Sequence, residues 1–135
     1  MLIDGFISAA EGGPPQEVSL FWWQGYSSRY HLTSIFDLKN FDCREAGAFV
    51  IVRREDDGVR TPLFVGAAKS ISDDIYDDFG TEMMRAIAAG ANEVHVHFGE
   101  DCPWLCDAMV DDVARGWSLE MVRPRVSALS ARVFA

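Results

Sequence analysis

The chain has 135 residues, is 49% hydrophobic, and carries 21 acidic against 12 basic residues for a net charge of −9. This length and apolar content fit one domain with its own core, and they exclude a disordered or fibrous class. The acidic balance argues against nucleic acid as a partner, because a polyanion is repelled at long range unless the basic groups gather on one face.

Cysteine usage and the amino-terminal sequence bear on the compartment. The three cysteines, Cys43, Cys102 and Cys106, are odd in number and irregular in spacing, which suits a reducing environment. No basic stretch precedes an apolar one near Met1, and no apolar run is long enough to span a bilayer. We therefore expect a cytoplasmic protein without a membrane segment.

The first half of the chain contains an arm and two aromatic segments. Residues 1–16 include the breaker Glu11-Gly-Gly-Pro-Pro15 and are expected to be an irregular arm before the main domain, residues 17–117. Segments 18–23 and 30–36 are rich in aromatic and β-branched residues, which predicts one or two strands. Adjacent strand residues point to opposite faces, so one of Trp22 and Trp23 is a candidate for binding a protein partner.

A hairpin follows these segments. The runs 48–52 and 63–65 have strand length and flank the turn Glu55-Asp-Asp-Gly58, whose last residue tolerates positive φ. They predict an antiparallel hairpin. Pro62 cannot donate a hydrogen bond to a strand ladder, so the start of the second strand is expected at an edge or a bulge.

Two helices, a strand and a third helix come next. Ile71, Ile75 and Phe79 recur every four residues, which predicts a helix over 71–79 capped by Ser70 or Ser72. A second helix is predicted from the cap Thr81 to Ala89, stopped by Gly90, with Met83, Met84, Ile87 and Ala88 available for packing.

The segment 93–98 alternates, which places His95 and His97 on one strand face and valines on the other. Pro103 predicts the first position of a helix whose last turn ends at Gly116. The remaining residues, 118–135, are expected to be a tail packed on the domain or extending it.

This order of elements resembles the small GIY-YIG nuclease-like proteins. Gly47-Ala-Phe49 and Phe64-Val-Gly66 stand where that family has Gly-Ile-Tyr and Tyr-Ile-Gly, and the stretches "PLFVGAAKS" and "GANEVHVHF" are similar to family sequences. The resemblance covers roughly residues 20–116. It implies an α/β (α+β) domain with a central antiparallel or mixed three-stranded sheet flanked by helices.

The same resemblance identifies the positions that carry catalysis in the family. Its two tyrosines correspond to Phe49 and Phe64, its phosphate-binding arginine to Asp74 or a neighbour, and its metal-binding glutamate to a position near Met109. A phenyl ring transfers no proton, an aspartate repels a phosphate, and a thioether does not suit Mg²⁺. The motif is therefore degenerate, and we expect no nuclease chemistry at these positions and no cofactor.

Two other sets of residues have both a functional and a purely structural interpretation. His95 and His97 could hold a metal with Cys102 or Cys106, but packing or surface placement is the more common role of such residues. Cys106 is interpreted as a small buried hydrophobe. Asp107 or Asp111 would restore a metal ligand after a one-turn shift of the alignment.

Three functions remain open from the sequence. The first is a catalytically inactive GIY-YIG-like domain that acts as a binding or accessory module for another protein. The second is a divergent nuclease with a rearranged site built from Asp107, Asp111, His95 or His97. The third is an acidic mimic of DNA that occupies a DNA-binding protein. The sequence indicates neither the partner nor the oligomeric state.

Overall fold

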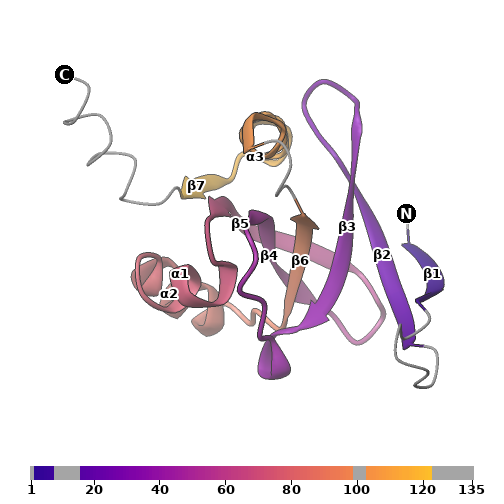
Figure 1. Cartoon of the computed structure of the whole chain (residues 1–135), viewed down its shortest axis with the longest axis horizontal. Coiled ribbons are helices and arrows are strands. Elements are labelled where there is room, and N and C mark those ends of the chain that lie inside the picture. Colours follow the sequence, from indigo (N-terminus) through magenta and orange to yellow (C-terminus); the bar gives the residue numbers. More distant parts are fainter. Residues whose placement is uncertain (1, 8–15, 99–102, 123–135) are drawn as a thin grey trace.

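The computed structural model describes residues 2–7, 16–98 and 103–122. Within these residues the fold is α+β, with seven strands in one mixed sheet and three α-helices. Figure 1 shows α1 and α2 together on one side of the sheet and α3 on the other. Among the described residues, none of the helices combines the length and the apolar character needed to cross a bilayer.

The predicted hairpin lies inside this sheet. Strand β4 (Gly47–Arg54) pairs antiparallel with β5 (Arg60–Ala68), and Gly58 in the turn has φ of +91°. The register shifts between Ile51, opposite Phe64, and Val52, opposite Pro62. Both predictions, the turn glycine and the irregularity at Pro62, are confirmed.

The prediction of three central strands is wrong, because the sheet continues on both sides of the hairpin. Its order is β1-β2-β3-β6-β4-β5-β7, and every neighbouring pair is antiparallel except β5 and β7, which are parallel. The two aromatic segments form β2 (Gln16–Gln24) and β3 (Tyr30–Asp37), and β3 joins the sheet through β6 (Glu93–Phe98). A short 3-10 helix, Leu38–Asn40, follows β3.

The two terminal segments also add strands. Leu2–Ile7 forms β1 on the edge of the sheet beside β2, so this part of the expected irregular arm is regular structure. Glu120–Val122 forms β7, which packs the start of the expected tail onto the domain. The breaker at 11–15 and the rest of the tail, 123–135, lie outside the described residues.

The helical part of the chain is divided differently from the prediction. Helix α1 (Ile71–Tyr76) is short, and Phe79 stands at the N-cap of α2 (Gly80–Ala88) instead of ending the first helix. The predicted apolar face is nevertheless buried, since Ile71, Ile75 and Phe79 are at most 3% exposed. Ser70 occupies the N-cap of α1, but its hydroxyl donates to Asp73 and caps no backbone N–H.

Helix α2 exposes residues that were expected to pack. Met83 is buried, whereas Met84 is 74% and Ile87 is 52% exposed, and Ala88 is exposed as well. Helix α2 packs against the sheet along a narrow apolar face, so only one residue in each turn is buried in the core. Gly90 follows the helix with φ of +99°, as expected for a helix stop.

Helix α3 (Pro103–Trp117) begins at the predicted proline but ends one residue beyond the predicted glycine. The left-handed residue after the helix is Ser118, with φ of 55°, and not a glycine. Gly116 serves a different purpose, because a Cβ there would lie 2.8 Å from the backbone nitrogen of Tyr26. The glycine lets the β2–β3 hairpin approach the helix.

The core consists of two apolar clusters separated by the sheet. Phe49, Ile51 and Phe64 belong to the cluster under α1 and α2, whereas Val50 and Met109 belong to the cluster under α3. Alternate residues of β4 therefore serve opposite clusters, as strand geometry requires. This division fixes which of the candidate residues can meet.

Candidate functional site

The residues that were compared with a nuclease motif fall on both sides of the sheet. Phe49 is fully buried and Phe64 is 3% exposed, and their rings contact edge to face at 6.0 Å in the cluster under α1 and α2. Met109 is buried on the other side of the sheet. Asp74 lies on α1, where one carboxylate oxygen accepts from the backbone nitrogens of Lys69 and Ser70.

Gly47 and Gly66 allow close packing between strands. A Cβ at Gly47 would lie 2.6 Å from the carbonyl oxygen of His97, and one at Gly66 would lie 2.4 Å from a methyl of Val122 and 2.8 Å from the ring of Phe49. Both glycines are buried. They allow β6 and β7 to lie beside the hairpin, which is a structural role.

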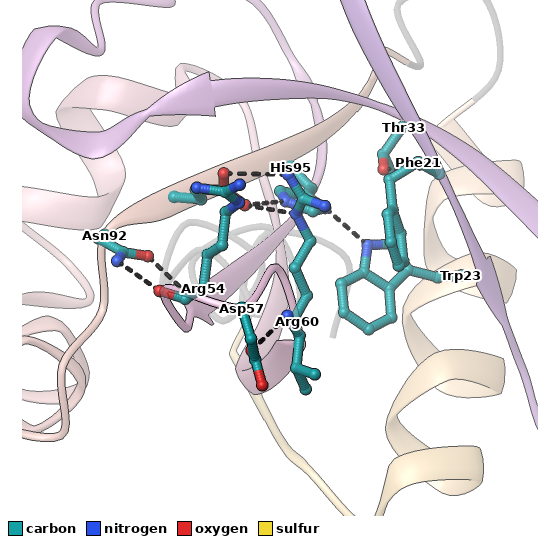
Figure 2. Close-up of polar contacts among 10 residues, drawn as sticks. Phe21, Trp23, Thr33, Arg54, Asp57, Arg60, Asn92 and His95 are labelled. Carbon is teal, nitrogen blue, oxygen red and sulfur yellow. Dashed lines mark hydrogen bonds and ion pairs between the residues drawn. The ribbon is translucent and has the colours of Figure 1, made fainter. Parts of the chain in front are cut away.

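His95 is the centre of a buried polar network. The indole Nε1 of Trp23 donates to His95 Nδ1 at 2.9 Å, and His95 Nε2 lies 2.9 Å from a carboxylate oxygen of Glu93. Because Nδ1 accepts, the proton is on Nε2 and is donated to Glu93. Figure 2 shows the indole of Trp23 directed at the imidazole of His95.

Arg60 closes this network from β5. Its guanidinium donates to both carboxylate oxygens of Glu93, at 2.8 and 3.3 Å, and lies over the ring of Phe21. The two ion-pair partners are only 10% and 13% exposed. Hydrogen bonds from His95 and Arg60 outweigh the effect of burial and lower the pKa of Glu93 to about 2, whereas burial lowers the pKa of His95. His95 is therefore a neutral core residue.

The other residues of the proposed metal site are also placed. His97 Nδ1 lies 2.8 Å from the carbonyl oxygen of Leu32, and Cys106 is 4% exposed, as expected for a small buried hydrophobe. Cys102 lies outside the described residues. Within the part of the chain that the structure describes, no three histidine, cysteine or acidic side chains group as metal ligands would.

Trp22 and Trp23, the aromatic residues proposed for partner binding, are adjacent on β2 and point to opposite faces of the sheet. Trp23 is 1% exposed and faces α3, so it is unavailable to a partner. Trp22 is half-buried, and its indole nitrogen is buried without a hydrogen-bond partner. The exposed aromatic side chains nearby are instead Tyr26 and Tyr30 of the hairpin, 72% and 54% exposed, and Trp117 of α3, 46% exposed.

A surface hollow of about 500 Å³ lies where the β2–β3 hairpin meets α3. The hairpin contributes Tyr26, Ser27, Arg29 and His31 to its lining. Helix α3 contributes Ala108, Asp111, Asp112 and Arg115. We call this feature the hairpin hollow.

Asp112 fastens the hairpin to the helix beneath this hollow. One carboxylate oxygen accepts from the backbone nitrogen of Ser27 at 2.8 Å, and the other contacts Ser27 Oγ at 2.7 Å and His31 Nε2 at 2.8 Å. The Asp112 carbonyl oxygen also accepts from the backbone nitrogen of Tyr26. We call these contacts the Asp112 clamp. Burial raises the pKa of Asp112, but the hydrogen bonds from His31 and Ser27 together outweigh it and lower the pKa to about 2.

Two glycines make the clamp sterically feasible. A Cβ on Gly25 would lie 2.1 Å from a carboxylate oxygen of Asp112, and a Cβ on Gly116 would lie within 3 Å of the hairpin backbone. Trp117 completes the junction by donating its Nε1–H to the carbonyl oxygen of Gln24 at 2.9 Å and packing edge to face on Trp23. The hairpin is thereby held at several points.

The Asp112 clamp does not have the geometry of a Ser-His-Asp triad. In such a triad the histidine lies between serine and aspartate and receives the proton of the hydroxyl. Here both Ser27 and His31 contact the carboxylate of Asp112, so the hydroxyl donates to aspartate and no base activates it. The arrangement positions a loop and its exposed side chains.

Sequence reasoning missed most of this site. No local pattern links Ser27 to Asp112, because the two residues are 85 positions apart in the sequence. The only local signal is the turn Tyr26-Ser-Ser-Arg-Tyr30, in which aromatic and arginine residues cluster. Comparison of the chain with protein-family models, curated proteins and solved structures gave no match.

Proposed function

We propose that the chain is a non-catalytic, GIY-YIG-like domain of the cytoplasm that binds another protein through the exposed residues around the hairpin hollow. The observation that carries this proposal is the group of exposed aromatic and arginine side chains on a fixed support. Tyr26, Tyr30 and Trp117 are all about half exposed or more, and Arg29 and Arg115 line the same junction. Tyrosine, tryptophan and arginine supply most hot spots of protein interfaces.

The support beneath these side chains favours binding. Side chains on a mobile loop lose conformational entropy when a partner binds, whereas those on a fixed loop lose less. The Asp112 clamp and the Trp117 hydrogen bond hold both strands of the hairpin against α3. Ser28 at the tip has φ of 70°, a conformation that a non-glycine residue adopts at some energetic cost.

The placement of the motif residues supports the non-catalytic part of the proposal. Phe49 and Phe64 fill the core under α1 and α2, so neither ring could meet a phosphodiester without unpacking the domain. Met109 lies in the opposite cluster. The net charge of −9 also repels nucleic acid electrostatically.

Affinity capture with matched variants tests the proposal. Immobilised full-length protein should capture a defined protein from an extract of the cells that carry it, and the double variant Tyr26→Ser/Tyr30→Ser should retain at least about tenfold less. Tyr76→Ser is the control, because Tyr76 is a similarly exposed tyrosine, at 52%, on α1. Equal capture by all three proteins would contradict the proposed surface.

A nuclease assay tests the competing function. Purified protein should leave plasmid and structured DNA intact in Mg²⁺ or Mn²⁺. Cleavage that disappears in Asp107→Asn or Asp111→Asn would establish the divergent nuclease and overturn the proposal. Capture of a DNA-binding enzyme that survives the tyrosine substitutions would instead favour an acidic DNA mimic.

A further inference from the structure

The described arginines differ in whether a carboxylate accompanies them. Arg44, Arg53, Arg60 and Arg85 each have a carboxylate oxygen within 4 Å. The side chains of Arg29, Arg54 and Arg115 have no such partner among the described residues, and two of these three line the hairpin hollow.

A shortage of acids does not explain the two unpaired arginines. The chain has 21 acidic residues, and two of them, Asp111 and Asp112, line the same hollow. Both oxygens of Asp112 are already used by Ser27 and His31. Among the described residues Asp112 therefore makes no ion pair with Arg29 or Arg115, whose guanidinium groups are available to an incoming anion.

We propose that the hairpin hollow binds a carboxylate side chain of an acidic segment of the partner protein, held by Arg29 and Arg115. The inference rests on the proposed function, because it specifies the partner at the same surface. Arginine donates two parallel hydrogen bonds that match the geometry of a carboxylate. The volume of about 500 Å³ admits a side chain, and Tyr26 at its edge offers an apolar contact.

The charge of the molecule favours a carboxylate-bearing protein segment over a nucleic acid. A long polyanion would interact with the whole surface, whose net charge is −9, whereas a short segment interacts chiefly with the local arginines.

The direct test is a titration of full-length protein followed by NMR of the arginine Nε–H groups. The probe is N-acetyl-glutamate N-methylamide, and the neutral glutamine analogue is its control. We expect saturable shifts at Arg29 and Arg115 with a dissociation constant on the order of millimolar, as one charged group supplies only a few kcal/mol. The glutamine analogue should cause no saturable shift.

Variants test whether the glutamate probe binds in the hairpin hollow. Arg29→Gln and Arg115→Gln should each weaken binding of the glutamate probe by about fivefold or more. Arg54→Gln is the matched control, since Arg54 also lacks a carboxylate partner but lines a different hollow. Equal weakening by Arg54→Gln, or no saturable shift at either arginine, would overturn the inference.

Two further measurements are needed. One distinguishes a carboxylate from other anions, and the other distinguishes the carboxylate proposal from the proposed protein-binding function. Inorganic phosphate or a thymidine oligonucleotide that binds the same arginines more tightly than the glutamate probe would overturn the choice of a carboxylate. In affinity capture, loss of the partner in Tyr26→Ser/Tyr30→Ser but not in Arg29→Gln/Arg115→Gln would leave the protein-binding function standing and refute the carboxylate. Capture that depends on neither pair would refute the proposed function, while the titration would still decide the inference.

Discussion

Two histidine–carboxylate pairs in this molecule have the same chemistry and different consequences. His95 and Glu93 lie on one strand, and their network is closed by Trp23 and Arg60. His31 and Asp112 lie on different elements and border the hairpin hollow. The first pair has all its partners inside the fold, whereas the second holds a loop that presents Arg29 beside Arg115 of α3. The surroundings of such a pair, and not its residue types, decide whether it belongs to a core or supports a surface.

The largest loss of stability is expected when the buried network around Glu93 and His95 is broken. Glu93→Gln removes the charge that compensates Arg60, whose side chain is only 10% exposed. Leaving a nearly buried charge without its partner should lower the free energy of unfolding by about 3 kcal/mol, measured by urea denaturation. The replacement of Arg44, an exposed arginine, by glutamine should change stability by less than about 1 kcal/mol. Similar losses in both variants would contradict the distinction between the two environments.

The next effect tests the close approach of hairpin and helix. Gly116→Ala places a Cβ within 3 Å of backbone atoms of Gly25 and Tyr26, which cannot yield as a flexible side chain would. We expect a loss of about 2 kcal/mol in the free energy of unfolding. Gly80→Ala is the control, because a Cβ there meets nothing within 4 Å, and it should be neutral or slightly stabilising. A neutral Gly116→Ala would show that the junction is looser than described.

A smaller, pH-dependent loss in the free energy of unfolding is expected when the Asp112 clamp is broken. The pKa of Asp112 in the folded protein is about 2, below its ordinary value, so the ionised form favours folding. Asp112→Asn should therefore cost about 1 to 2 kcal/mol above about pH 5. The difference between wild type and variant should shrink as the pH falls from about 5 toward 2. A difference that stays constant over this range would mean that the charge of Asp112 contributes nothing.

The smallest effect is expected on the outer face of α2. Met84 is 74% exposed among the described residues, so Met84→Gln should change the free energy of unfolding by no more than about 0.5 kcal/mol. The neighbouring Met83, 2% exposed, is the comparison, and Met83→Gln should cost several-fold more. A large loss in Met84→Gln would indicate that another part of the chain covers this face.

Local sequence patterns were sufficient for most elements. The Asp-Gly turn predicted the β4–β5 hairpin, Pro103 predicted the start of α3, and the alternation around His95 predicted β6, because each depends on the conformational preferences of a few adjacent residues. The same patterns gave no information about strand order. Placing β6 between β3 and β4 depends on pairings between distant segments, so the expected sheet was too small.

The sequence by itself determined an acidic α+β domain, its β4–β5 hairpin and the start of α3. Only the tertiary structure decided that Phe49 and Met109 lie on opposite faces of the sheet and that Asp112 meets Ser27 and His31. The physical reason is that helices and turns form from interactions between near neighbours, whereas a site requires a carboxylate and a hydroxyl from distant segments to lie within hydrogen-bond distance. Which distant segments meet is set by the packing of the whole core, and no local pattern records it.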